Sequence, residues 1–406
     1  MKFTNVELWN ALRAKYKSFA SITAEATADT FTEKGWGEIS RNNIPALNQF
    51  FELSMRVAFN KMDIARVNTR LEESGLVEVY GGNNGGYLQR ISIESIAPIS
   101  PGFINLTNGD SIDPFIVRKP ESKERFFECG NFNYQSLITI QEYQVKTIFL
   151  AESGMSAFLA GIMVGLENGY KQQKELNCYK ALHECINSTE KPLQDTQKLT
   201  VTSWTDGGAT EAELLDFIAQ LQDLATAMDT AITQPGFNAN KFDTAVSPAD
   251  NIALVRAGIM NQIKRMKALN VHYDGASNML EIPFKVMEVA DFGGIQHYVM
   301  VGDQKKVLYP HYDPKLGEVD GWSTTSGGEK EYALDAANVL VEDLDANVLA
   351  VVAQKGLIFE DVKEPYQVQP IYNPRGMYNN YWANAANNMI RYDANYTCVT
   401  ISKPAK

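Results

Sequence analysis

Between Gly82 and Val145 the sequence has almost no helical periodicity, and this stretch limits the possible folds more than any other feature of the chain. It contains SPGFINLTNGDSIDPF, the charged run RKPESKER (118–125) and the strand-like segment YQSLITIQEYQVKTIF. A loop of this length without structure of its own is uncommon inside a compact domain. We therefore predict a long two-stranded arm that projects from the body. Because an isolated two-stranded hairpin is only marginally stable in water, the arm needs a partner surface to lie on.

The segments on either side of this arm have recognisable helix and strand patterns. The first 75 residues favour helices, and LVEVYGGNNGGYLQRISI favours two strands joined by a turn over 81–86. A long helix is predicted from Ser153 towards Ile186, because apolar residues recur there at helical spacing. A small residue stands at every fourth position in the first half of this helix, which is typical either of a second backbone passing close by or of incidental glycines in a buried helix. These small residues are Ala157, Gly161, Gly165 and Gly169.

Later segments carry further helix and strand signals. Thr210 and Glu213 form a capping-box pattern before LLDFIAQLQDLATAM. Ser247 followed by Pro248 predicts the start of a helix over ADNIALVRAGIMNQIKRMKAL. The segments EIPFKVMEVADF and NVLAVVAQKGLIFED favour strands. Because helices and strands do not alternate regularly and no internal repeat is present, the pattern predicts an α+β fold.

Composition and charge argue against several classes of function. The 406 residues are 45% hydrophobic and 21% charged, as in ordinary folded proteins, and the length predicts two or three lobes or one large domain. The net charge of −12 argues against broad binding to nucleic acid, which needs a basic face. The N-terminus has no secretory signal pattern, so we expect the protein in a cytoplasm. The apolar run FLAGIMVGL is about half the roughly 20 residues that a membrane-spanning helix needs, so we expect no membrane partner.

No motif predicts catalysis, a metal site or a cofactor. The cysteines at 129, 178, 185 and 398 are predicted to be buried thiols. On a helix, His183 points away from the face shared by Cys178 and Cys185, so these three do not form a zinc site. GGNNGG lacks the lysine of a phosphate-binding loop, and LVEDLDAN lacks the glycine and terminal glutamate of a calcium loop. Carboxylate pairs among the 49 acidic residues stay open.

The segment NPRGMYNNYWANAANNMIRYDANYTC, residues 373–398, is rich in asparagine and aromatic residues. Such a cluster is typical either of a ligand site with stacked aromatic rings or of a structural joint in which these rings are anchors. Pro374 and Gly376 indicate a turn at its start. The residues singled out here are Arg375, Tyr378, Tyr381 and Trp382.

Residues 372–402, YNPRGMYNNYWANAANNMIRYDANYTCVTIS, closely resemble the closing segment of the major capsid proteins of small short-tailed bacteriophages. These proteins have the fold named after phage Hong Kong 97. The order of the preceding segments agrees with that fold, in which an N-terminal arm is followed by an extended loop, a long spine helix, and peripheral and axial domains.

The resemblance implies a division of the chain into five parts. Residues 1–81 correspond to the N-terminal arm and helices, and 82–145 to the extended two-stranded loop. Residues 146–205 correspond to the spine helix and peripheral domain, and 206–355 to the axial domain with peripheral-domain crossings. Residues 356–406 correspond to the return to the peripheral domain and the C-terminal strand.

The resemblance also implies a function and partners. It implies a structural protein without enzymatic activity, cofactor or metal, which assembles into hexamers and pentamers of an icosahedral or prolate head around double-stranded DNA. The implied partners are other copies of the chain, a portal protein, a separate scaffolding protein and the packaged DNA, which it contacts weakly and without sequence specificity. The implied location is the virion capsid, assembled in the host bacterial cytoplasm. We expect no immunoglobulin-like surface domain and no maturation proteolysis.

In such a shell the charged run on the extended loop has a natural role. Its basic residues are predicted to meet an acidic surface of a neighbouring subunit and to set register more than strength, because exposed ion pairs contribute about 0 to 1 kcal/mol each. These residues are Arg118, Lys119, Lys123 and Arg125. A solvated charge run without a partner is the alternative. An isopeptide bond from Lys119 or Lys123 to an asparagine within 373–388 is a chemical alternative that the sequence does not support further.

Two rival functions stay open at this point. An encapsulin-like compartment shell would use the same fold to hold enzyme cargo. A carbohydrate-binding, tail-associated protein would use the aromatic rings and amides of 373–398, and it requires those rings to be exposed.

Overall fold

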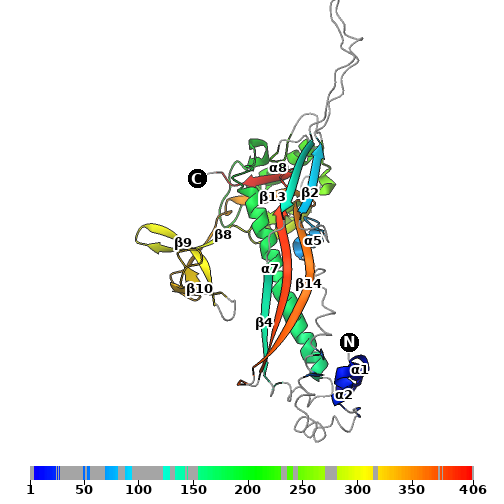
Figure 1. The fold of residues 1–406 in the computed structure, drawn as a ribbon. Helices are drawn as coiled ribbons and strands as arrows, with labels where there is room; N and C mark the ends of the chain where they lie inside the picture. The colour runs from blue at the N-terminus through cyan, green and yellow to red at the C-terminus, as the bar shows by residue number, and fades with distance from the viewer. Residues whose placement is uncertain are drawn as a thin grey trace, which may run out of the picture.

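The computed structural model describes residues 4–23, 25, 27, 49–50, 53–54, 69–80, 87–93, 122–128, 133–141, 144, 154–229, 236–240, 246–269, 281–313, 319–373, 375–376 and 378–404. Its longest element is helix α7 (Gly154–Ile186), which confirms the predicted long helix. Figure 1 shows α7 running along the length of the molecule, with a long sheet beside it.

This long sheet has four strands in the order β1-β14-β15-β4. Strands β14 (Ile358–Asn373) and β15 (Tyr378–Tyr392) form an antiparallel hairpin. Strand β1 (Val77–Tyr80) pairs in parallel with β14, and β4 (Asn133–Gln141) pairs antiparallel with β15. Helix α7 packs against β15, so the helix and the hairpin support each other over much of the molecule's length.

A central sheet of five strands forms the best-buried part of the molecule. It contains β5 (Lys198–Thr200), β16 (Cys398–Ser402), β13 (Val348–Gln354), β6 (Asn251–Arg256) and β7 (Lys285–Val289), in that order. Helices α8 (Glu211–Asp229) and α9 (Ile259–Leu269) share a hydrophobic core with one face. The C-terminal half of α7 shares a second core with the other face. Strands buried on both faces read as continuous apolar runs, as in β6 and β13.

A second sheet of five strands projects from the body, on the left in Figure 1. Its order is β11-β10-β9-β8-β12. The strands are β8 (Ile295–Val301), β9 (Gln304–Tyr312), β10 (Val319–Ser323), β11 (Tyr332–Ala333) and β12 (Leu340–Asp343). We refer to residues 295–344 as the projecting sheet.

The remaining described elements are short. Strands β2 (Tyr87–Ile93) and β3 (Ser122–Glu128) form an antiparallel two-stranded ribbon, which we call the ribbon. Helices α1 (Asn5–Lys15) and α2 (Lys17–Ile22) lie near one end of α7, where Trp9, Phe19 and Phe50 pack their rings together. Helix α5 (Arg70–Ser74) precedes β1, and two 3₁₀ turns, η4 (Asp195–Gln197) and η5 (Pro248–Asp250), precede β5 and β6.

The helix predicted to start at Ser247 is wrong in its first half. Ser247 precedes the turn η5, residues 251–256 form strand β6, and the helix α9 begins only at Ile259, after Gly258 with φ +93°. The apolar run of β6 is buried on both faces of the central sheet, and a short continuous apolar run does not distinguish a buried strand from a buried helix.

Two strands pair with partners far away in the sequence rather than with the strand nearest to them along the chain. Within 82–145, β3 pairs with β2, whereas β4 pairs with β15 of the long sheet. The last strand, β16, pairs with β13 and β5 of the central sheet rather than extending the long sheet. The predicted turn over 81–86 lies outside the described residues.

The glycines of α7 do not contact another backbone within the described chain. A Cβ atom added at Gly161, Gly165 or Gly169 would have no described atom within 4 Å. The closely passing backbone that their spacing predicts is therefore not found among these residues. Among the described helices, none is long and apolar enough to cross a membrane.

The predicted capping box at the start of α8 is confirmed, and it provides a test of local stability. The backbone N–H of Thr210 donates to Glu213 Oε2 at 2.7 Å, and the Glu213 N–H donates to Thr210 Oγ1 at 3.4 Å. We expect Thr210→Ala to lower the free energy of unfolding by about 1 kcal/mol, because it removes the side-chain acceptor. Chemical denaturation measures this loss. Thr226→Ala, farther along α8, is the control, and an equal loss there would contradict a capping effect.

Candidate assembly surfaces

The four basic residues predicted on the extended loop are only partly described. Arg118 and Lys119 lie outside the described residues, and Lys123 and Arg125 lie on β3 of the ribbon. The register of the ribbon pairs Arg125 with Arg90 of β2. The sequence analysis did not single out Arg90, because strand register is not readable from local sequence where no face is known to be buried.

The tip of the β14–β15 hairpin is built around Asn373. Its Oδ1 atom accepts the backbone N–H groups of Arg375 (3.0 Å) and Gly376 (3.3 Å), and its Nδ2 atom donates to Tyr378 Oη at 2.7 Å. A Cβ atom at Gly376 would collide with the Tyr378 ring. The predicted turn is therefore present, and Arg375 is exposed at its end, while Tyr378 is half-buried.

The two aromatic residues that follow are positioned by the long sheet. Tyr381 is 1% exposed, in register with Pro370 of β14 and Ile138 of β4. Trp382, its neighbour along β15, is half-buried. Asn380 accepts a hydrogen bond from Thr139 of β4 at 2.7 Å. A sugar site needs exposed rings, and the burial of Tyr381 favours the structural interpretation of this segment.

A buried ionic cluster joins α7 to two other elements. Lys174 of α7 is 1% exposed and forms ion pairs with Glu72 of α5 and with Glu360 of β14, the latter at 2.9 Å. The pKa of Glu360 is raised to about 8, mainly by burial and in part by the nearby Glu72, while the attraction of Lys174 opposes the rise.

The two chain segments that connect the projecting sheet to the body, which we call its neck, lie against α7. Polar contacts hold the second of these segments to the helix. Asp345 accepts hydrogen bonds from His183 Nδ1 and Asn187 Nδ2, both at 2.7 Å. The hydrogen bond with Asp345 raises the pKa of His183. Arg256 donates to the carbonyl oxygen of Asp345 at 2.6 Å and pairs with Asp343.

The first connecting segment, which precedes β8, also lies close to α7. Gly293 has φ +90°, and a Cβ atom there would collide with the Tyr179 carbonyl. The two chain segments that connect the projecting sheet to the body are thus both fixed to the same helix.

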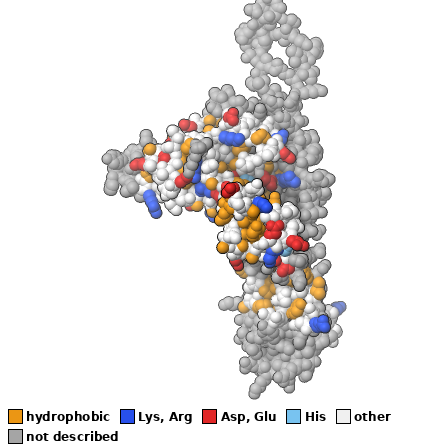
Figure 2. Space-filling view, turned by 90° about the vertical axis from the view of Figure 1, so that its left-hand side faces the viewer, with side chains coloured by type: hydrophobic (Ala, Val, Ile, Leu, Met, Phe, Trp, Pro, Cys, Tyr) orange, Lys and Arg blue, Asp and Glu red, His pale blue; other side chains and the backbone are white. Residues whose placement is uncertain are grey.

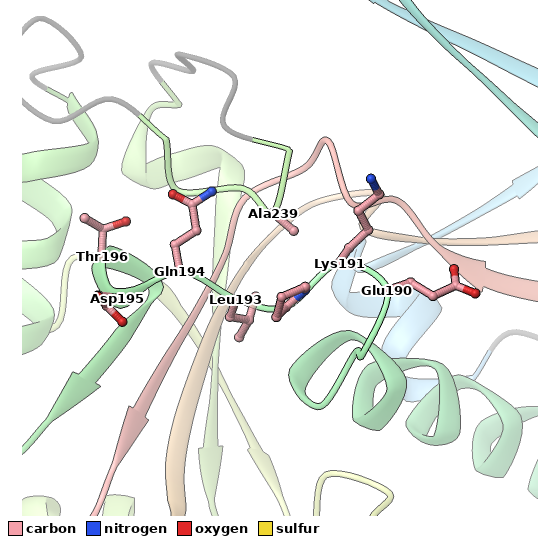
Figure 3. A pocket seen from close by; sticks show the side chains of 8 residues that line it. Glu190, Lys191, Leu193, Gln194, Asp195, Thr196 and Ala239 are labelled. Carbon is pink, nitrogen blue, oxygen red and sulfur yellow. The ribbon is translucent and has the colours of Figure 1, made fainter.

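The structure also contains a groove of about 660 Å³ between the loop after α7 and Ala239. Figure 3 shows its lining side chains, which come mainly from residues 190–196. Glu190, Lys191 and Asp195 are the charged members, and all three are exposed on this loop. Among the described residues, no group of three or more histidine, cysteine or acidic side chains is placed to hold a metal ion. Cys178, Cys185 and Cys398 are buried and form no disulfide, and Cys129 lies outside the described residues.

Comparison with solved structures identifies the fold. The chain is similar to a chain in the capsid structure of Staphylococcus phage Andhra, with a TM-score of 0.56 and 12% identity over 85% of this chain and 87% of the other. It is also similar to a chain in a structure of the head fibre and inner core protein gp22 of native bacteriophage P68, with a TM-score of 0.51 and 13% identity over 82% and 84% of the two chains. The comparison with curated protein sequences found no significant match.

The fold is that of a phage shell subunit of the Hong Kong 97 type, as the resemblance predicted. A model of the Phi29-like phage major capsid protein family matches residues 41–395. The chain belongs to this family, and it is a structural protein of a phage head, located in the virion capsid. The predicted identification as a phage major capsid protein is thus confirmed.

The sequence analysis missed Lys174, although a signal was present. Buried residues of α7 recur at four-residue spacing at Leu166, Tyr170, Lys174 and Cys178. A lysine on the apolar face of a predicted helix indicates a buried ion pair, because an unpaired buried charge is very costly.

Proposed function

We propose that this major capsid protein assembles into hexamers and pentamers that close into a head around double-stranded DNA. The partners in this proposal are further copies of the chain, a portal protein and a separate scaffolding protein. Assembly takes place in the host cytoplasm, the contact with packaged DNA is weak and non-specific, and the role is structural rather than enzymatic. The five-part division of the chain given above is part of the same proposal.

One observation carries the proposal beyond family membership. The ribbon pairs with no third strand in the described part of the chain. A two-stranded ribbon is marginal in water. This cost is removed when the ribbon lies on the surface of a neighbouring copy, so the folded subunit favours self-association.

Electron microscopy and light scattering of the purified protein test this proposal. We expect ring-shaped capsomers or closed shells, and we expect their yield to fall as salt screens the ribbon's charges, because the Debye length shortens from about 10 Å at 0.1 M salt to about 3 Å at 1 M. A monodisperse small oligomer that forms neither rings nor shells at any salt concentration, with or without a co-expressed scaffolding protein, would contradict self-assembly.

A further inference from the structure

The projecting sheet carries most of the exposed large hydrophobic side chains of the described chain. Among the described residues fourteen such side chains are exposed, and nine of them lie within 295–344. Val341 is 61% exposed and Tyr312 is 56% exposed. Figure 2, which faces the side from which this sheet projects, shows hydrophobic side chains gathered near its centre. Such a concentration of exposed apolar side chains marks an interaction surface.

Strand register places four of these side chains on one face of the sheet. His297 of β8 lies opposite Val341 of β12 on one side and opposite Leu308 of β9 on the other. Side chains an even number of positions away along a strand share the face of these three residues. Trp322 stacks on the His297 ring with ring centroids 4.1 Å apart. The exposed apolar residues of this face, which we call the apolar face, are Ile295, Val301, Tyr312 and Val341.

The turns and loops of the projecting sheet add an excess of exposed carboxylates. Ion pairs neutralise Asp320, Glu342 and Asp343 of the sheet. Of the described lysines of the sheet, Lys306 alone is outside these pairs, and it is exposed. This excess of negative charge opposes DNA and favours a basic protein surface. The exposed acidic residues outside the ion pairs are Asp303, Glu329, Glu331 and Asp335, all between strands.

The described surface of the subunit has no second apolar patch that matches the apolar face. The other five exposed large hydrophobic residues are scattered, with one each on β1, α8 and β14 and two on α7 at Val164 and Leu176, twelve residues apart. Within the described residues, a second copy therefore has only its own projecting sheet with which to cover this face. Two such sheets would bring exposed carboxylates together, and like charges across a contact are unfavourable.

The neck holds the projecting sheet in a fixed position beside α7. Contacts of Asp345 and Gly293 attach both connecting segments to this helix. Figure 1 shows the sheet projecting to the left of α7, and none of its residues belongs to either hydrophobic core of the central sheet. A surface that is already ordered loses little conformational entropy on binding, so this arrangement favours docking of a partner.

We propose that the apolar face is the docking site for a different protein of the phage particle, whose contact surface has an apolar centre and a basic rim. Burial of the apolar face stabilises this contact, and lysine or arginine side chains of the partner pair with the exposed carboxylates of the sheet. This inference rests on the proposed self-assembly, because the shell presents the site in many copies, and it adds a partner that is not another copy of the chain.

Hydroxyl-radical labelling with peptide mass spectrometry tests the site in unassembled subunits, in shells of the purified chain alone and in particles from infected cells. We expect Tyr312 to be labelled at equal rates in subunits and shells, and about tenfold more slowly in particles, because a docked protein excludes water from the contact. Leu215, exposed on α8, is the internal control and should be labelled equally in shells and particles.

Two results of this comparison would overturn the inference while leaving self-assembly intact. Slow labelling of Tyr312 in shells of the chain alone would assign the cover to another copy. Labelling in particles as fast as in subunits would show that nothing covers the apolar face. Failure of self-assembly is distinct from both, because the purified chain would then form no shells.

Charge reversal provides an independent test of the basic rim. We expect the double variant Asp303→Lys with Asp335→Lys to return the labelling of Tyr312 in particles to the rate in shells, because the new lysines repel the basic rim. Asp229→Lys, an exposed position at the end of α8, is the matched control and should leave Tyr312 protected. Asp303→Asn with Asp335→Asn provides the same comparison if the lysines impair assembly. Full protection of Tyr312 in both double variants would contradict a basic partner.

Discussion

Replacing Lys174 with methionine is expected to lower the free energy of unfolding by about 3 to 5 kcal/mol, which is typical when one partner of a buried ion pair is removed. The side chain is 1% exposed and is the cation between Glu72 and Glu360. Without it, two carboxyl groups lie in a buried site with no positive charge. Because these residues belong to α5, α7 and β14, the loss weakens the joint between three elements.

Urea denaturation of the unassembled subunit measures this effect. Lys180→Met, at an exposed position six residues farther along α7, is the matched control and is expected to change stability by less than about 0.5 kcal/mol, as surface substitutions usually do. Equal losses for the two lysines would show that the buried cluster is not important for stability.

The same cluster gives a pH dependence with a defined sign. Burial raises the pKa of Glu360 from 4.5 to about 8, so between these two values the folded chain binds a proton that the unfolded chain has released. The contribution of Glu360 to stability is therefore fully present below pH 4.5 and is lost progressively as the pH rises towards 8. We expect Glu360→Gln, which cannot ionise, to flatten this fall in a series of thermal unfolding curves. A parallel pH profile for the variant and the parent chain would contradict the raised pKa.

The second large effect is expected at Tyr381. Tyr381→Ala should lower the free energy of unfolding by about 3 to 5 kcal/mol, as is usual when a buried aromatic ring is removed and a cavity remains. The ring is 1% exposed in β15, between β14 and β4, so its loss affects both flanking strand pairs. Denaturation of the unassembled subunit provides the measurement.

Two controls separate packing from other roles of this segment. Tyr381→Phe retains the ring and is expected to lose much less stability than Tyr381→Ala. Trp382→Ala, at the half-buried neighbouring position, is also expected to cost less. If Tyr381→Ala left stability unchanged, the structural interpretation of this aromatic segment would be wrong.

Features whose determinants lie within a few residues of one another were predictable from the sequence. The helix over Gly154–Ile186 follows from its apolar periodicity, and the capping box at Thr210 follows from side chains three residues apart. The hairpin turn at Asn373 to Gly376 follows from turn-forming residues. The resemblance of the last segment to phage capsid proteins then predicted the family.

Features that depend on distant partners were not predictable. Residues 251–256 form a strand because two hydrophobic layers bury both of its faces, and the local pattern also fits a helix. Arg90 became a candidate only through its register with Arg125. The apolar surface of the projecting sheet was not apparent either, because the same residues would be buried if a helix covered that sheet.

The sequence by itself determined the local elements, the acidic balance and the membership of a capsid family. Only the tertiary structure decided which strands pair and which charges are buried. Strand β4 joins β15 across more than two hundred residues, and β16 joins the central sheet instead of the adjacent long sheet. The physical reason is that backbone hydrogen bonds between strands carry no local sequence signature, and a lysine such as Lys174 is stable in the interior only when the fold brings carboxylates to it from other elements.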